Sequence, residues 1–201
     1  MHPMHHTEKP AVTTLPLADV IRRRWSSVAL SDATLDQQTI DTLFEAARWA
    51  PSCYNDQPWR FVYAEKGDVN RAALESLLME GNAWAKQAGL LVIGFARKNL
   101  TRNEKPNAFH FYDLGCATGF LVLQATAMGL ASHQMAGYAM DKANAALGVP
   151  DTYAPGAMIA IGHQGESSLL NDAAKQRETS PRQRNAREAI AFTTWKGKDG
   201  I

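Results

Sequence analysis

This 201-residue sequence has few cysteines and no excess of one charge. The two cysteines, Cys53 and Cys116, lie far apart and form no CxxC pair, so no disulfide framework is expected. The 21 basic and 20 acidic side chains give a formal net charge of +1. This balance argues against a protein that binds nucleic acid or a membrane surface. The absence of a disulfide framework favours a protein of the reducing cytoplasm.

Several motifs of familiar chemistry are also missing. The sequence contains no G-x-G-x-x-G after a predicted strand, no P-loop, no HExxH, no G-x-S-x-G and no Cys/His zinc spacing. These absences argue against a Rossmann dinucleotide fold, a P-loop NTPase and a zinc enzyme. No metal site is predicted. A serine hydrolase or a metalloenzyme would need residues that only the fold brings together.

Length and composition favour one domain. At 22.0 kDa and 45% hydrophobic residues, the chain suits a single domain, which we place at residues 14–195. The histidine-containing residues 1–13 lack the apolar core of a signal peptide. They are expected to form a disordered or tag-like tail, as chain termini commonly do. Residues 196–201 are expected to form a short C-terminal tail.

The longest uncharged stretch runs from Leu114 to Ala131 and is about long enough to span a bilayer. It carries Thr118, Gln124 and Thr126. This polarity favours a long helix that is buried on most of its faces inside a globular protein.

Hydrophobic periodicity predicts alternating helices and strands. Thr34 and Gln37 suggest a capping box for one of the helices. Ile190–Phe192, an apolar triplet in a polar tail, is expected to pair with a sheet edge of this or another subunit. We therefore expect an α+β fold in which a small mixed sheet is flanked by helices and one long helix is buried. The expected helices are 17–25, 34–50, 67–78, 109–128 and 141–147, and the expected strands are 61–64, 90–96, 131–135 and 157–161.

The most informative stretch is Ala46–Phe61, AARWAPSCYNDQPWRF. A helix ends at Pro51, and Pro58 begins an extended segment. Between the two prolines, small and polar side chains and backbone N–H groups could contact a flat polar ligand. The alternative is an ordinary loop that ends a helix.

This loop resembles the P-S-x-x-N-x-Q-P-W signature of the nitroreductase family of FMN enzymes. Arg24-Trp25-Ser26 resembles the family's N-terminal R-x-S motif at the FMN phosphate and ribityl chain. A guanidinium fork and a hydroxyl suit phosphate oxygens. Arg182 and Arg184 resemble a C-terminal basic pair that closes on the phosphate. The alternative for both basic segments is a solvated surface.

The resemblance assigns cofactor contacts to further residues. Ser52 and Cys53 would approach the isoalloxazine from one subunit, and Asn82 would bind its polar edge. Gln134–Tyr138 resembles the segment that places backbone N–H groups near flavin N5, although Gly137 could be a simple turn glycine. The cofactor-binding residues expected from these segments are Pro51, Ser52, Cys53, Asn55, Gln57, Asn82, Ala136 and Gly137.

The resemblance implies an FMN-dependent oxidoreductase that forms an intertwined homodimer with its site at the interface. Hydride from NADPH or NADH would pass through flavin N5 to a nitroaromatic, a quinone or a similar electron-poor small molecule, by a ping-pong mechanism. No side chain is expected to act as catalytic acid or nucleophile. Phe109, His110, Phe111 and Tyr112 could line the acceptor pocket by stacking, or could pack in the core at a helix start.

One position departs from the family pattern. R-x-S-x-R ends in a basic residue near flavin N1 and O2, where this sequence has Val28. A cation there stabilises the anionic reduced flavin, and Lys86 or Arg60 could replace it. The departure favours the alternative of a flavin-binding sensor or storage protein without efficient turnover.

Overall fold

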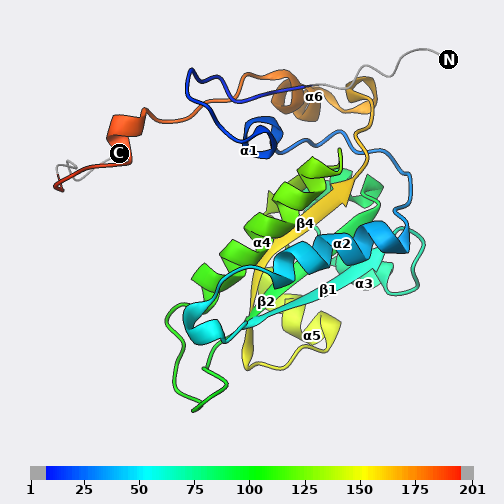
Figure 1. Ribbon diagram of the computed structural model, residues 1–201. Coiled ribbons are helices and arrows are strands. Elements are labelled where there is room, and N and C mark those ends of the chain that lie inside the picture. Colours follow the sequence, from blue (N-terminus) through cyan, green and yellow to red (C-terminus); the bar gives the residue numbers. More distant parts are fainter. Residues whose placement is uncertain (1–7, 196–201) are drawn as a thin grey trace.

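The computed structural model describes residues 8–195, which form a sheet with helices on both faces and a further helical layer (Figure 1). The predicted α+β class is confirmed. The four strands pair in the order β1-β2-β4-β3. They are β1 (Trp59–Glu65), β2 (Leu90–Arg97), β3 (Ala131–Met135) and β4 (Tyr153–Gly162).

Every pairing among these strands is antiparallel, so the sheet is antiparallel and not mixed as expected. The direction of a strand depends on how the preceding connection returns to the sheet, which hydrophobic periodicity does not encode. β2 and β4 occupy the centre of the sheet. The fully apolar run at 90–96 is thus a central strand, as its composition predicts.

Six α-helices and five short 3-10 segments connect and cover the strands of the described chain. The helices are α1 (Asp19–Arg23), α2 (Gln37–Arg48), α3 (Arg71–Ser76), α4 (His110–Ala127), α5 (Ala143–Leu147) and α6 (Asp172–Thr179). The 3-10 segments are η1 (Cys53–Asn55), η2 (Glu80–Gln87), η3 (Met140–Lys142), η4 (Ser167–Leu169) and η5 (Arg187–Ala189). α6 lies where the sequence predicts only a polar tail.

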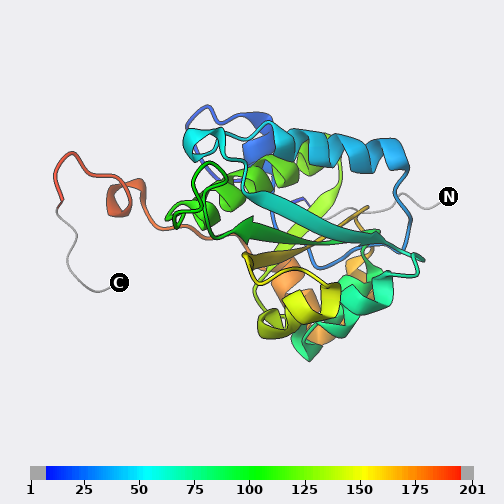
Figure 2. The same ribbon diagram turned by 90° about the horizontal axis from the view of Figure 1, so that it is seen from below.

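The two faces of the sheet carry separate apolar cores (Figure 2). On one face, α2 and α4 pack against alternate residues of the central strands. On the other face, α3, η2 and α5 cover the intervening residues. The first core includes Leu43, Leu114, Leu121, Leu90, Val92 and Ile159, and the second includes Leu74, Leu77, Tyr138, Leu91, Ile93 and Met158.

α4 is the predicted long helix, but only part of its surface is buried. Leu114 and Leu121 are 4% and 0% exposed, whereas Tyr112 and Phe120 are 76% and 41% exposed. A Cβ added at Gly115 would meet no atom within 4 Å. α4 therefore presents an apolar face that no described residue covers. No helix in the described chain is long and apolar enough to cross a membrane.

The start of α2 differs from the predicted capping box. The N-cap is Asp36, whose Oδ1 accepts a hydrogen bond from the Thr39 N–H at 2.7 Å. An Asp carboxylate is as good an N-cap acceptor as a Thr hydroxyl. The helix consequently begins at Gln37, three residues beyond Thr34.

The segment 8–13, α1 and α6 form a layer at one end of the body (Figure 1). Lys9 Nζ donates to the carbonyl oxygens of Arg177 and Glu178 at 3.2 and 2.9 Å, and the Ala11 N–H donates to the Arg22 carbonyl at 2.8 Å. The described part of the predicted N-terminal tail thus contacts the fold. Residues 1–7 and 196–201 lie outside the described residues.

Ile190–Phe192 belongs to none of the described strands. Ile190 is 71% and Phe192 40% exposed, and this end of the chain runs away from the body (Figures 1 and 2). The expected pairing with a sheet edge is therefore not made within the described chain.

Arg71 holds η2 against β1. Its side chain is buried and donates to the carbonyl oxygens of Ala64, at 3.1 Å, and Ala88, at 2.9 Å. Its Nε also donates to Glu75 at 2.9 Å. A planar guanidinium can satisfy several carbonyl groups that would otherwise be buried without partners. The position of η2, which carries Asn82, depends on this side chain.

We expect Arg71→Lys to lower the free energy of unfolding by about 2 kcal/mol, since a single ammonium cannot replace the guanidinium fork. Denaturant unfolding monitored by circular dichroism measures the change. The control is Arg48→Lys, which alters an exposed pair with Glu45 and should leave stability unchanged. Equal effects of the two variants would contradict this role of Arg71.

Candidate functional site

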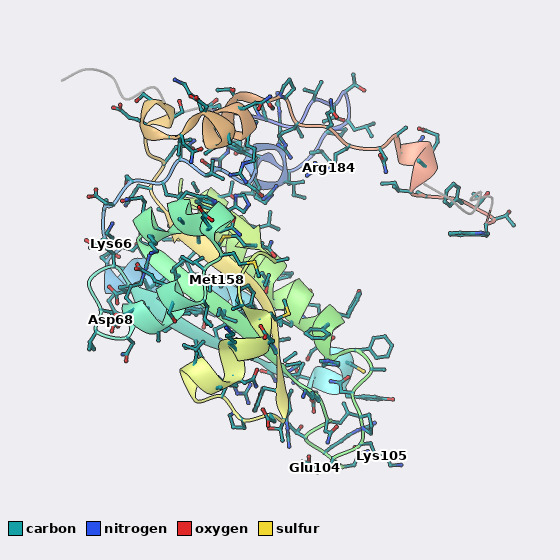
Figure 3. The ribbon with its side chains drawn as sticks, turned by 180° about the vertical axis from the view of Figure 1, so that it is seen from behind. Lys66, Asp68, Glu104, Lys105, Met158 and Arg184 are labelled. Carbon is teal, nitrogen blue, oxygen red and sulfur yellow. The ribbon has the colours of Figure 1, made fainter. Side chains whose placement is uncertain are left out.

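Arg24, Arg182 and Arg184 form a cluster of positive charge. Figure 3 shows Arg184 at the upper end of the molecule. Burial lowers the pKa of Arg24, and the nearby charges of Arg182 and Arg184 lower it further. Arg24 Nη1 also donates to Ser26 Oγ at 3.2 Å. Within residues 8–195, no acidic side chain forms an ion pair with any of the three. The cluster therefore has the charge and the donors to bind an anion.

Arg182 also ties distant segments of the chain together. Its Nη1 donates to the carbonyl oxygens of Lys9 and Arg22 at 2.8 and 3.0 Å. The Lys9 ammonium in turn lies 4.5 Å from the centre of the Trp25 ring. Trp25 thus contacts the same layer as the cluster. All four predicted phosphate-side residues, Arg24, Ser26, Arg182 and Arg184, come from this layer.

Asn82 and Gly137 form a second group. Asn82 Nδ2 donates to the Gly137 carbonyl at 2.9 Å, and Trp84 Nε1 donates to Asn82 Oδ1 at 3.2 Å. A Cβ at position 137 would lie 2.5 Å from Asn82 Nδ2, so the contact requires glycine. The amide of Asn82 keeps one hydrogen and one acceptor site for a ligand. Among the described residues, the N–H of Gly137 has no hydrogen-bond partner.

The loop 51–57 is strained and is held by α4. Tyr54, Asn55 and Gln57 have positive φ angles of +53°, +54° and +47°, a region that side chains other than glycine occupy at a cost. The Cys53 N–H donates to both carboxylate oxygens of Asp113 at 3.2 Å. Backbone strain of this kind often marks a functional loop.

Two of the predicted site residues in this loop, Ser52 and Gln57, already bond within it. Ser52 Oγ accepts from the Gln57 N–H at 3.0 Å, and Gln57 Nε2 donates to the Asn55 carbonyl at 3.2 Å. Ser52 therefore shapes the loop, whatever else it contacts. The side chain of Asn55 is exposed. Pro51 lies between the end of α2, at Arg48, and the turn.

The predicted acceptor-pocket aromatics lie beside this loop, at the start of α4. Phe109, Phe111 and Tyr112 are 54%, 50% and 76% exposed, so the alternative of core packing does not describe them. Phe109 and Tyr112 meet edge to face at 6.3 Å, and His110 Nδ1 lies 2.7 Å from the Asn107 carbonyl. These rings would line a pocket only if another surface faced them.

The arginine cluster and the loop 51–57 lie at opposite ends of the folded molecule. Asp56 Oδ1 accepts from the Thr101 N–H at 2.8 Å, which places the loop beside the segment that continues to Glu104 and Lys105. Figure 3 shows these two residues at the far end from Arg184. One chain thus does not bring all the predicted site residues together.

A cavity of about 1490 Å³ lies beside the arginine cluster, larger than the roughly 300–1,000 Å³ typical of ligand pockets. Its walls include Arg24 and Trp25 but none of Ser52, Asn82 and Gly137, so it overlaps the predicted flavin site only on the phosphate side. Its walls include Arg24, Trp25, Val28, Trp84, His163 and Arg177.

Val28, at the position of the family's cation, is buried at 3% exposure. Its N–H donates to Glu178 Oε2 at 2.8 Å. Of the two suggested substitutes, Arg60 donates to the Gln57 and Trp59 carbonyl oxygens at 3.1 and 2.6 Å. Arg60 therefore belongs with the loop 51–57, at the opposite end from Arg24. Lys86 is exposed on η2.

Sequence reasoning missed three polar residues around these groups, namely the buried Asp113 and Glu178 and the half-buried His133. Asp113 and Glu178 are 2% and 1% exposed. His133 contacts the Ser27 carbonyl through Nδ1 at 3.1 Å, and burial lowers its pKa. Asp113 beside an apolar run offered a weak signal. Glu178 lies in a polar segment that reads as solvated, and no local pattern marks it.

The fold and the arginine cluster define an α+β protein with a positively charged site. A profile of the Nitroreductase family matches residues 21–94 and 78–163, which together span more than half of the chain. The chain belongs to the nitroreductase family of oxidoreductases, as its motifs indicate.

The chain also resembles individual proteins. The chain is 35% identical over 130 residues to an uncharacterized 15.4 kDa protein in the ask 5' region of Mycolicibacterium smegmatis, covering 65% of this chain and 86% of the relative. It also resembles a crystal structure of an oxidoreductase containing FMN, with a TM-score of 0.88, 35% identity and coverage of 93% and 96% of the two chains. A candidate nitroreductase from Desulfovibrio desulfuricans in complex with FMN shares the fold, with a TM-score of 0.69, 22% identity and coverage of 91% and 99%.

Asp113 gives a prediction on pH dependence. Burial raises its pKa above the ordinary value of 3.8, although the Cys53 N–H opposes the shift. The folded state therefore binds the proton more tightly than the unfolded state, and ionised Asp113 lowers stability as the pH rises through the folded pKa.

For Asp113→Asn we expect the free energy of unfolding, relative to wild type, to rise between about pH 3.5 and pH 7, because the amide avoids this penalty. Denaturant titrations over that range measure it. Asp151→Asn, at an exposed position, serves as the control. A difference between Asp113→Asn and wild type that does not vary with pH would contradict the assignment.

Proposed function

We propose that the protein is an FMN-dependent oxidoreductase that transfers electrons from NADPH or NADH to nitroaromatics, quinones or similar electron-poor small molecules. The observation that carries the proposal is the cluster of Arg24, Arg182 and Arg184, which has no acidic partner among the described residues. Family membership and the FMN-containing relative of 35% identity support the choice of FMN as the anion. The free cysteines Cys53 and Cys116 fit a reducing, cytoplasmic location.

The residues present fit the two ends of FMN. Arg24, Arg182, Arg184 and Ser26 would hold the phosphate through charge-assisted hydrogen bonds. Asn82 and the Gly137 N–H would hold the polar edge of the ring system. His133 contacts the Ser27 carbonyl, next to the arginine cluster. Gly137 lies four residues after His133, and four residues of extended chain span at most about 14 Å. The two groups are therefore close enough for one ligand to reach both. An elongated ligand with a charged end and a planar polar end suits this arrangement.

FMN, when bound, supplies hydride acceptance at N5 and electron donation to the second substrate. The protein's residues orient FMN and enclose the substrates. Asn82 and Gly137 fix the ring edge, and the strained loop 51–57 with the α4 aromatics provides a stacking surface for planar substrates. As the resemblance to the family implies, the two substrates are proposed to use the same slot in turn.

The active protein is proposed to be a homodimer with composite sites. The arginine cluster and the loop 51–57 lie at opposite ends of one chain, so a complete site would take one group from each subunit. The apolar face of α4, with Gly115 and Phe120, gives a surface for close helix approach. The exposed Ile190–Phe192 segment could cover the partner. Such an interface would bury enough apolar area to keep the dimer together.

A flavin-binding sensor or storage protein is the second candidate. Burial of Val28 favours it, since no cation at that position can stabilise an anionic reduced flavin. Steady-state turnover distinguishes the two candidates. Absence of turnover with NADPH or NADH and a quinone or nitroaromatic, in FMN-saturated protein, would support the second candidate and contradict the first.

The visible spectrum of the purified protein tests the proposal directly. After addition of FMN, we expect a bound-flavin spectrum that bleaches with NADPH or NADH under nitrogen and returns when an acceptor is added. A flavin spectrum that neither nucleotide bleaches would favour a flavin-binding sensor or storage protein. A protein that stays colourless with added FMN would overturn the cofactor assignment.

Arg24→Ala should weaken FMN binding by about tenfold or more, because a charge-assisted phosphate contact is lost. FMN affinity in wild type should fall with added salt, and less steeply in the variant. Fluorescence titration of flavin-free protein measures both. Arg22→Ala, at an exposed arginine in the last turn of α1, two residues before Arg24, should have a much smaller effect. An unchanged FMN affinity in Arg24→Ala would refute the phosphate assignment.

Composite sites predict complementation between subunits. Arg24→Ala and Asn55→Gly should each reduce activity, and glycine accepts the positive φ at position 55 without strain. A mixed dimer would contain one intact site, so a randomly mixed population should regain about a quarter of the wild-type sites. Co-expression followed by activity measurement checks this. No recovery in mixed dimers of confirmed composition would show that both groups act within one subunit.

A further inference from the structure

Glu178 is buried on a helix that is otherwise mostly exposed. Of the residues in α6, only Ala174 and Glu178 are buried, at 2% and 1% exposure. A buried carboxylate is costly unless charge-assisted hydrogen bonds satisfy it. An apolar side chain would fill the same space at lower cost. The presence of Glu178 therefore calls for a role beyond packing.

The carboxylate of Glu178 receives hydrogen bonds from the segment that directly follows Arg24–Ser26. Ser27 Oγ donates to Oε1 at 2.7 Å, and the Val28 N–H donates to Oε2 at 2.8 Å. Gln164 Nε2 adds a third donor to Oε1 at 3.3 Å. Both oxygens are thus occupied, and a buried backbone N–H that would otherwise lack a partner is satisfied.

Glu178 also lies four residues before Arg182. The carboxylate consequently joins the two segments that supply the arginine cluster, 24–26 and 182–184, which are far apart in the sequence. Arg24 and Arg182 repel one another, and one bond between their segments comes from the Arg182 guanidinium itself, which donates to the Arg22 carbonyl. Glu178 is a second anchor between the two segments, and it pairs with neither guanidinium among the described residues.

The anchor continues toward the group around Asn82. The carbonyl of Ser27 contacts His133 Nδ1 at 3.1 Å, and the His133 ring packs on Trp84 with a centroid separation of 4.7 Å. Trp84 in turn donates to Asn82. The segment that Glu178 holds is therefore in contact, through two rings, with the residues proposed for the polar edge of FMN.

We propose that Glu178 is a positioning residue that sets the relative placement of the two phosphate-binding segments and thereby the affinity for the phosphate end of FMN. The inference rests on the proposed function, because it takes FMN as the anion. Glu178 does not touch the ligand. Its effect should depend on the ligand's phosphate, which distinguishes positioning from a general contribution to stability.

The test compares FMN with riboflavin, which has the same ring system but no phosphate. Dissociation constants for both are measured by flavin fluorescence on full-length, flavin-free protein. We expect Glu178→Ala to weaken FMN binding by about tenfold or more, since charge-assisted bonds are lost and the Val28 N–H is left unpaired. Riboflavin affinity should change by less than about twofold.

Glu178→Gln is the conservative variant and should lose only about threefold in FMN affinity. Its amide can accept from the Val28 N–H and donate to Ser27 Oγ, whose hydrogen can turn to the Ala29 carbonyl, 3.3 Å away. Ser27→Ala should weaken FMN selectively too, and combining it with Glu178→Gln should add less than the sum of the two effects. The matched control is Asp172→Asn, the same change of charge at an exposed position of α6, which should alter neither affinity.

Each outcome decides a separate question. Wild-type protein that binds FMN no more tightly than riboflavin would overturn the phosphate assignment in the proposed function. With FMN preference present in wild type, equal losses for both flavins in Glu178→Ala, or no loss, would overturn the positioning role. Should Glu178→Ala fail to fold, an unchanged ratio of the two affinities in Glu178→Gln and Ser27→Ala would overturn it instead.

Discussion

The fold depends on a sheet whose two central strands are buried on both faces. β2 and β4 carry apolar side chains on each side, and the hydrophobic effect requires a cover for both. α2 and α4 cover one face, and α3, η2 and α5 cover the other. This arrangement leaves the outer face of α4 apolar and exposed. It also places η2, with Asn82, beside the segment that follows β3, with Gly137.

A second constraint is electrostatic. Three guanidinium groups held together without an acidic partner among the described residues repel one another, and burial of Arg24 adds to the cost. A bound anion would remove much of that cost. In the described structure, backbone carbonyl groups accept hydrogen bonds from Arg182 and offset part of this cost. The carboxylate of Glu178 holds the flanking segments from outside the cluster.

The arrangement of the candidate site follows from both constraints. The layer that carries the arginines packs at one end of the body, whereas the loop 51–57 is tied to the start of α4 at the other end by Asp113. In the proposed homodimer, an exposed and apolar face of α4 would bring one end of each chain to the opposite end of its partner. Exposure of the α4 aromatics has the same explanation.

The sequence by itself determined the family, the α+β class and most of the helices and strands, because hydrophobic periodicity and the motifs around Arg24 and Pro51 are local. It did not reveal that the sheet is antiparallel, that Asp36 caps α2, or that a helix forms at Asp172–Thr179, since these depend on chain direction, on competition between neighbouring caps and on packing. Only the tertiary structure decided which polar residues are buried. Glu178 lies in a polar segment and is buried because its hydrogen-bond partners, Ser27 and Val28, are distant in sequence and close in space.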